Sequence, residues 1–230
     1  MNDTESIDFS KIRAVTFDAG GTLIEPWPSV GHVYAEVARV HLGAAPDSER
    51  LNAQFRDTWK SKPGFDYSRA AWLDLVKRSF KGICPDPEVF FESLYRRFGE
   101  PDTWHVHEDV FPTLQQLRAT GRRLAVISNW DERLRPLLNR LGLAHFFEQI
   151  IVSIDAGYTK PAPQIFRQAL EVLGLEPNEI LHVGDSEIED VAGPQEVGIP
   201  ALLLCRGPRK HGNGRVIGAL TELTSLFQGR

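Results

Sequence analysis

The chain has 230 residues, of which 42% are hydrophobic, enough for one substantial core and a small satellite domain. Its formal net charge of −5 provides no overall basic field for nucleic acid. No apolar run approaches the length of a membrane-spanning helix, and residues 1–11 lack the basic and apolar regions of a signal peptide. We therefore expect a cytoplasmic protein with neither a membrane nor a nucleic-acid partner.

The first predicted element is a short strand that ends at a carboxylate. The apolar run Ala14 to Phe17 is followed by Asp18, then by residues 19–21, which are too small to cover that carboxylate. Thr22 then offers a hydroxyl. A lone aspartate after a strand is more often a turn or helix-cap residue than a catalytic one, so its role depends on the rest of the chain.

Residues 30–99 have a different pattern, which predicts helices and no strand. Apolar side chains recur there at helical spacing, as in Val33, Val37 and Val40. Ser48 and Ser68 are suitable helix-start residues. About four helices are expected. We interpret residues 27–101 as a separate helical domain inserted into the rest of the chain.

From Val110 onward the pattern alternates between strands and helices. Helices are predicted to begin near Pro112, Arg133, Pro163 and Ile188, and to end near Gly121, Gly142, Gly174 and Gly198. The predicted strands are the apolar runs 124–127, 150–152, 180–183 and 201–204. Continuous apolar strands that alternate with helices favour a parallel sheet covered on both faces. We therefore predict a doubly wound α/β core domain made of residues 1–26 and 102–230.

Polar residues follow four of the predicted strands. Asp18 follows the first, Ser128 and Asn129 follow the second, and the segments 155–161 and 184–190 follow the next two. In open α/β sheets, ligands bind beyond the carboxyl ends of the strands. We expect these four groups to meet in one cleft.

Together these groups suit phosphoryl transfer. A carboxylate such as Asp18 can attack phosphorus to give an aspartyl-phosphate, which water then hydrolyses. Lys160 would neutralise charge on the transferring group, and Ser128 would hold its oxygens. The acidic loop that contains Asp185 and Asp190 has the ligands that Mg²⁺ prefers, and this cation would offset the repulsion between Asp18 and a phosphate.

The order of these residues resembles the four motifs of the haloacid dehalogenase-like (HAD) hydrolase superfamily, and the resemblance covers nearly the whole chain. The helical insertion looks like the type-one cap of subfamily I. Segments 124–134 and 156–166 look like the rhythmically-expressed-gene-like branch. The resemblance implies a HAD Rossmann-like core with an inserted helical cap, and a Mg²⁺-dependent phosphatase that acts on a small phosphomonoester.

The same resemblance implies a role for each site residue. Asp18 would be the nucleophile, assisted by Lys160. The phosphate would be bound by Thr22, Ser128, Asn129 and Lys160, and the metal site would comprise Asp18, the Gly20 carbonyl, Asp185 and Asp190. Asp190 would act in the outer shell of the metal or orient Lys160.

One position departs from the family pattern. HAD phosphatases usually carry a second aspartate two residues after the nucleophile, as general acid and base, and this chain has Gly20 there. Glycine still offers its carbonyl to a metal, but the proton-transfer contribution of ~10²–10⁴-fold must come from elsewhere or be lost. We therefore expect weak activity, or activity restricted to esters with good leaving groups. His32 is a candidate replacement donor.

Two other functions remain open. Phosphonoacetaldehyde hydrolases of this superfamily also have a small residue at the position of Gly20, and they use a cap lysine for a Schiff base. Four cap lysines could take that role: Lys60, Lys62, Lys77 and Lys81. The second alternative is a catalytically faded protein that binds a phosphorylated metabolite. In either case we expect a monomer or a weak homodimer.

Two further sequence features suggest weaker sites. His105 and His107 are two residues apart, but the sequence offers no evident third ligand, so a zinc site is not expected. The basic stretch 206–211 is short and lacks interleaved aromatic residues, so we expect an exposed loop.

Overall fold

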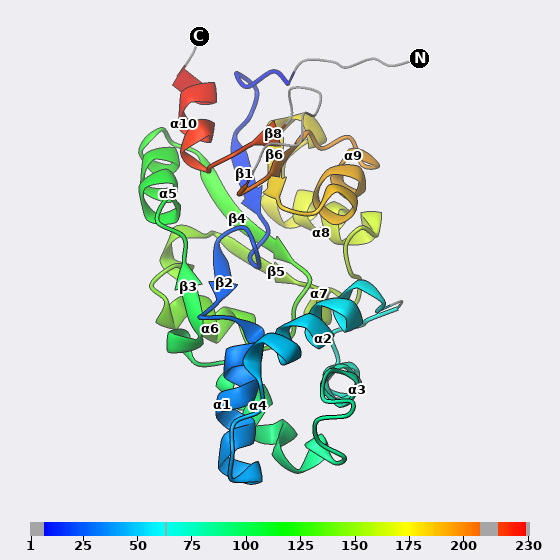
Figure 1. Cartoon of the computed structure of the whole chain (residues 1–230). Helices are drawn as coiled ribbons and strands as arrows, with labels where there is room; N and C mark the ends of the chain where they lie inside the picture. The colour runs from blue at the N-terminus through cyan, green and yellow to red at the C-terminus, as the bar shows by residue number, and fades with distance from the viewer. Residues whose placement is uncertain (1–6, 63, 208–215, 229–230) are drawn as a thin grey trace.

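The computed structural model describes residues 7–62, 64–207 and 216–228. A sheet flanked by helices forms one part of the molecule, and helices α1–α4 form a second part beyond one end of the sheet (Figure 1). Residues 208–211 of the basic stretch lie outside the described residues.

The main sheet confirms the predicted fold class. Neighbouring strands are hydrogen-bonded in the order β5-β4-β1-β6-β7-β8, and every pair is parallel. The strands are β1 (Ala14–Phe17), β4 (Arg123–Ser128), β5 (Gln149–Val152), β6 (Ile180–Gly184), β7 (Ala201–Leu204) and β8 (Val216–Ile217). The first five match the apolar runs of the sequence. The short edge strand β8 was not predicted.

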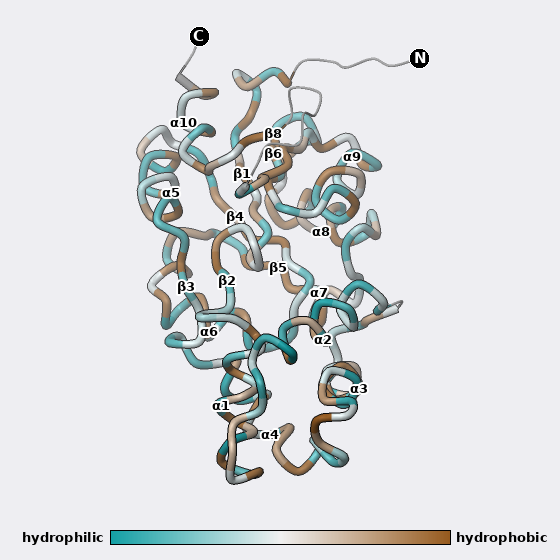
Figure 2. Tube along the Cα trace, in the orientation of Figure 1, coloured by the Kyte–Doolittle hydropathy of each residue, from teal (hydrophilic) through white to brown (hydrophobic). Residues whose placement is uncertain are grey.

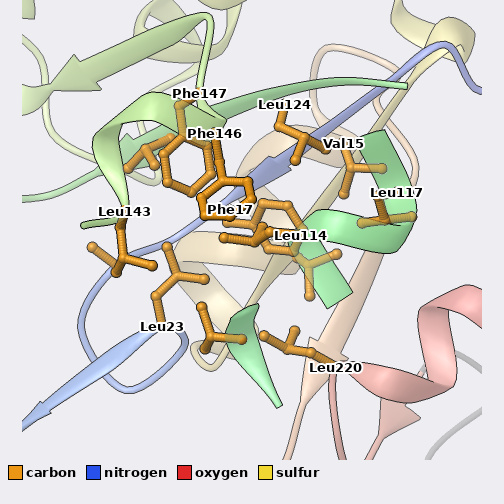
Figure 3. Close-up of a cluster of buried hydrophobic side chains, with 14 of the residues drawn as sticks. Val15, Phe17, Leu23, Leu114, Leu117, Leu124, Leu143, Phe146, Phe147 and Leu220 are labelled. Atoms are coloured by element: carbon orange, nitrogen blue, oxygen red, sulfur yellow. The ribbon is translucent and has the colours of Figure 1, made fainter. Parts of the chain in front are cut away.

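The two faces of β1 contact different helical layers. Val15 and Phe17 pack into a cluster with Leu114 and Leu117 of one helix (Figure 3). Ala14 belongs to a second cluster on the opposite face. Successive side chains of a strand point to opposite faces of the sheet. The sheet is therefore buried on both sides, as the continuous apolar runs predicted.

Three helices of the core domain begin close to the predicted positions: α5 (Val110–Ala119), α6 (Leu134–Arg140) and α8 (Pro163–Leu173). The short helices α7 (Ser153–Ala156) and α9 (Gly193–Gln195) and the helix α10 (Thr221–Gln228) complete this domain, and α7 and α10 were not predicted. Gly174 ends α8 in the left-handed conformation, with φ 59°. The helix expected near Ile188 is instead a π-helical turn, η5 (Glu187–Ala192), followed by α9. Among the described residues, every helix is too short or too polar to span a bilayer.

The inserted residues form their own helical cluster. The helices are α1 (Val30–Leu42), α2 (Ser48–Lys60), α3 (Arg69–Ser79) and α4 (Phe91–Arg97), with a 3₁₀ turn, η1 (Pro87–Phe90), before the last. Their buried side chains make a separate hydrophobic core that includes Tyr34, Leu51, Phe80 and Phe90. Much of α2 is hydrophilic in Figure 2, since only a stripe of this helix is buried. We call α1–α4 the cap.

Two short strands connect the core to the cap. β2 (Ile24–Pro26) and β3 (Trp104–Val106) pair antiparallel, with Glu25 opposite His105. The predicted domain boundaries, after residue 26 and before residue 102, fall at the cap side of this ribbon. The division itself stays a prediction.

Candidate active site

Asp18 lies at the carboxyl end of β1, on the central strand of the sheet. Its Oδ1 accepts hydrogen bonds from Ser128 Oγ at 2.9 Å and from Lys160 Nζ at 2.6 Å. The residue is 7% exposed and lines a cavity between core and cap. Burial raises the pKa of Asp18, and the positive charge of Lys160 opposes that rise. The structure thus brings three residues from three strand ends into direct contact.

Lys160 is buried beneath this contact and is bound from several sides. Its ammonium also donates to Asp190 Oδ1 at 2.5 Å. Asn129 holds its backbone, because the Asn129 Oδ1 accepts from the Lys160 amide at 2.6 Å and the Asn129 Nδ2 donates to the Lys160 carbonyl at 2.9 Å. Burial alone would lower the pKa of Lys160, but Asp18 and Asp190 raise it well above its usual range. Lys160 is therefore a fixed positive charge beside the candidate nucleophile.

Two residues that the sequence analysis missed position Asp190. His182 Nε2 lies 3.1 Å from Asp190 Oδ1, and His182 Nδ1 lies 2.8 Å from Thr16 Oγ1. Burial lowers the pKa of His182, so the neutral ring can donate to Asp190 and accept from Thr16. Although burial alone would raise it, Lys160 and His182 lower the pKa of Asp190. His182 was inconspicuous because it lies inside the apolar run of β6.

Three carboxylates gather at the mouth of the core domain. Oxygen atoms of Asp18, Asp185 and Asp190 lie within 4.8 Å of one another. Asp185 is exposed and lines the cavity. Desolvation by the surrounding protein, together with the charges of Asp18 and Asp190, raises the pKa of Asp185 to about 7. Three negatively charged carboxylates at this spacing suit a hard divalent cation, which would offset the repulsion between them.

The glycines of the first loop allow these carboxylates to approach. Gly21 has φ 78°, and a Cβ at that position would overlap the Asp185 carboxylate. Gly20 lines the cavity together with Asp18. A Cβ on Gly20 would lie 3.1 Å from Cζ3 of Trp130, whose indole packs against Trp104. Trp130 therefore occupies the space next to Gly20 into which a larger side chain at that position would extend.

The predicted phosphate-binding residues do not all reach the cavity. Ser128 and Asn129 line it, and Lys160 contacts Asp18 from below. Thr22 is fully buried and is not part of the cavity wall, and its hydroxyl has no hydrogen-bond partner among the described residues. The geometry brings three of the four residues together and leaves the Thr22 hydroxyl outside.

The cap forms an aromatic roof over the site. The cavity measures about 390 Å³ and reaches from Asp18 to the inner faces of α2, α3 and α4. Its aromatic wall includes Phe55, Trp59, Tyr67 and Trp72 of the cap and Trp104 and Trp130 of the core. Such a wall favours a substrate with an apolar or planar portion, which would bury its surface there.

Two other predicted candidates lie elsewhere. His32 is exposed, hydrogen-bonds Ser29 at 2.8 Å and does not line the cavity. The expectation that His105 and His107 lack a third potential ligand is wrong, because Glu25 on the paired strand brings a carboxylate within 4.8 Å of both rings. Strand pairing, which the sequence did not reveal here, created that cluster.

Comparison with known proteins agrees with this geometry. Residues 12–198 match the haloacid dehalogenase-like hydrolase family. The chain is 36% identical over 212 residues to haloacid dehalogenase-like hydrolase domain-containing protein 3 from Homo sapiens, covering 86% of this chain and 84% of that protein. It is 29% identical over 218 residues to the rhythmically expressed gene 2 protein from Drosophila melanogaster, covering 85% and 84%.

A solved structure supports the same assignment. The crystal structure of a HAD phosphatase from Thermococcus onnurineus matches with a TM-score of 0.72 at 29% sequence identity, covering 95% of this chain and 99% of that one. The predicted superfamily is confirmed, and a relative with the expected branch name is among the matches. This chain belongs to the haloacid dehalogenase-like hydrolase family.

Proposed function

We propose that the protein is a Mg²⁺-dependent phosphatase that hydrolyses a small phosphomonoester through a phosphoryl group carried on Asp18. The observation that carries this proposal is the shared contact of Ser128 and Lys160 with one oxygen of Asp18, next to the Asp185–Asp190 carboxylates. This arrangement supplies a nucleophile, fixed positive charge and hydroxyl donor at one point. The similarity to a HAD phosphatase supports it.

A carboxylate oxygen of Asp18 would attack phosphorus, and the new oxygen–phosphorus bond of an acyl phosphate would form as the bond to the leaving oxygen breaks. Lys160 would offset the charge on the transferring oxygens, and the Ser128 hydroxyl would donate to one of them. Water would then attack phosphorus and release phosphate and the Asp18 carboxylate. Asp18, Asp185, Asp190 and the Gly20 carbonyl would hold Mg²⁺, which when bound neutralises phosphate charge and holds the ester in line.

A screen of phosphate esters tests the proposal. Wild-type protein should release inorganic phosphate from at least one small phosphomonoester with Mg²⁺, and release should stop when the metal is removed with EDTA. D18N should be inactive. D74N is the matched control, since Asp74 lies on the exposed side of α3. Phosphate release that persists in D18N contradicts the proposal. Retained phosphate binding without turnover of any ester would support the faded-protein alternative.

One observation favours C–P bond cleavage as a second candidate. Of the four cap lysines considered, Lys62 lines the cavity that contains Asp18. Burial lowers the pKa of Lys62 to about 8, and an amine that is partly neutral near physiological pH can condense with an aldehyde. Borohydride should then trap phosphonoacetaldehyde on Lys62 in the wild type and not in K62M. Absence of any adduct excludes this alternative.

A further inference from the structure

Gly20 leaves the leaving-group oxygen without the usual proton donor, so another group in the cavity wall must be sought. The candidate must have an exchangeable proton, must line the cavity that contains Asp18, and must be held in place by its neighbours. The loop between α2 and α3 contributes two residues that line this cavity and have exchangeable protons, Lys62 and Tyr67.

These two side chains form a hydrogen-bonded pair. The Lys62 Nζ donates to the Tyr67 hydroxyl oxygen at 3.0 Å. The same ammonium lies 3.1 Å from the centre of the Trp59 ring and farther from the rings of Phe65 and Tyr67, at 5.1 and 5.0 Å. Cation–π contacts hold it there. The Tyr67 oxygen accepts the hydrogen bond from Lys62, so the phenolic O–H can donate its own hydrogen to another acceptor.

The backbone at Tyr67 is strained. Its φ of 62° is the positive value of a non-glycine residue, and the side chain is 5% exposed. A bulky residue adopts this conformation only where the surrounding structure enforces it, and such strain clusters at functional sites. The strained turn directs the ring of Tyr67 inward to the cavity instead of outward to solvent.

Tyr67 lines the same cavity as Asp18. Its surroundings include the Asn129 amide, next in sequence to Ser128, and the carboxylate of Glu189. Burial and the negative charges of Glu189 and Asp18 raise the pKa of Tyr67, so its hydroxyl keeps its proton at neutral pH. A phenol with a raised pKa gives up its proton only if a second donor replaces it, and the half-buried Lys62, which donates to the Tyr67 oxygen, is placed to do so.

We propose that Tyr67, supplied by Lys62, is the general acid that protonates the leaving oxygen of the substrate. This inference rests on the proposed phosphatase function and names the group that takes the place of the side chain absent at Gly20. The assignment depends on the Lys62–Tyr67 contact, the inward turn at Tyr67 and their shared cavity with Asp18.

The proton transfers balance over the two half-reactions. As the bond from phosphorus to the leaving oxygen breaks, that oxygen takes the Tyr67 proton and Tyr67 takes one from the Lys62 ammonium, which becomes an amine. The water that then attacks phosphorus gives a proton to Tyr67, and Tyr67 returns one to Lys62. Both residues end in their starting states.

The dependence of rate on leaving group tests this role. We would compare p-nitrophenyl phosphate, whose leaving group needs no proton, with phenyl phosphate and glycerol 3-phosphate. A general acid should contribute at least about 100-fold with a poor leaving group. Y67F should therefore lower kcat/KM for glycerol 3-phosphate by about 100-fold and for p-nitrophenyl phosphate far less, so that the dependence on leaving-group pKa steepens.

A matched control and a second variant guard against a structural effect. Y95F removes a hydroxyl from the same cavity, but that hydroxyl donates to Glu132 at 2.7 Å, so all three esters should change by one common factor. K62M should steepen the leaving-group dependence as Y67F does. It should also abolish a fall in glycerol 3-phosphate turnover above pH about 8, where the Lys62 ammonium loses its proton. Among the described residues, Tyr67 bonds this ammonium and the Glu189 carboxylate favours its charged form.

The outcomes separate the two proposals. Equal losses on all three esters in Y67F and K62M overturn the general-acid role while leaving the phosphatase function intact. No phosphate release by the wild type from any ester overturns the phosphatase function, and the acid role with it. A steeper leaving-group dependence in both variants, but not in Y95F, supports the assignment.

Discussion

The Lys160 ammonium lies 2.6 Å from the Asp18 carboxylate, although the two residues are 142 positions apart in the sequence. Both are buried, and the same ammonium bonds Asp190. The pairing exists because β1 and the loop after β5 end at the same edge of one parallel sheet. It makes the nucleophile, its positive partner and the acidic loop one connected unit.

Removal of Lys160 should destabilise the protein strongly. K160M leaves Asp18 and Asp190 as buried carboxylates without their positive partner, which costs ~3–5 kcal/mol of unfolding free energy. Urea denaturation followed by circular dichroism measures this loss. K11M is the control, because Lys11 forms an exposed pair with Asp8 and should change stability by less than about 0.5 kcal/mol. A K160M variant as stable as K11M would mean that Lys160 does not compensate these charges.

Asp185 should make the metal-free protein less stable at alkaline pH. Its pKa in the folded protein, about 7, exceeds the unfolded value of 3.8, so the stability that the neutral carboxyl provides at low pH is lost as the pH rises through 7. D185N should therefore have a higher Tm than the wild type at pH 8 in EDTA, and an equal or lower one at pH 4.

The same variant should lose the stabilisation by Mg²⁺. A ligand that binds only the folded state raises Tm, so saturating Mg²⁺ should raise the Tm of the wild type and not that of D185N. Differential scanning fluorimetry at pH 8 measures both effects, with D74N as the control. An equal Mg²⁺ shift in D185N and wild type would place the cation away from Asp185.

Gly20 and Trp130 should be energetically coupled. An aspartate at position 20 would bring its Cβ to 3.1 Å from the indole, so Trp130 must move by a few tenths of an ångström. G20D alone should destabilise the protein, and W130L should relieve part of that cost. A double-mutant cycle should give a coupling of about 0.5–3 kcal/mol. Additive effects would show that the two side chains do not compete for space.

The same pair has a kinetic consequence. The added carboxyl can act as a second proton donor, so G20D in the W130L background should raise kcat for glycerol 3-phosphate above that of W130L alone. Phosphate release under Mg²⁺ saturation measures this difference. Unchanged turnover would count against the view that the missing aspartate limits the rate.

His182 should matter to both stability and turnover. H182L leaves the Thr16 hydroxyl and one Asp190 contact without their partner, and each buried unpaired group costs ~1–3 kcal/mol. Because Asp190 then holds Lys160 less firmly, kcat should fall more than KM changes. Chemical denaturation and steady-state kinetics measure the two effects. A loss of stability with full kcat would limit His182 to packing.

The sequence predicted those site residues that directly follow a strand. Asp18, Ser128 and Asp185 each follow an apolar run, and the parallel sheet inferred from those runs requires their convergence. The positions of α5, α6 and α8 followed from their start residues and the glycines that end them. These features depend on local sequence pattern and on the rule that ligands bind beyond the carboxyl ends of parallel strands, so they can be predicted from one sequence.

The remaining features depend on tertiary packing. Nothing local distinguishes Thr22, whose hydroxyl is enclosed, from a residue that faces the cavity. His182 had the pattern of a strand residue, and only its contact with Asp190 gives it a role. Tyr67 reaches the site because the cap folds over the core and its backbone turns the ring inward. Each of these needs the relative placement of segments far apart in the chain.

Rapid acid quenching during turnover tests the role of Asp18 most directly. Protein mixed with Mg²⁺ and p-nitrophenyl phosphate would be quenched within one turnover, digested, and searched by mass spectrometry for a phosphoryl adduct. We predict the adduct on Asp18 in the wild type and none in D18N. Steady phosphate release without an adduct on Asp18, undiminished in D18N, would contradict the proposed mechanism.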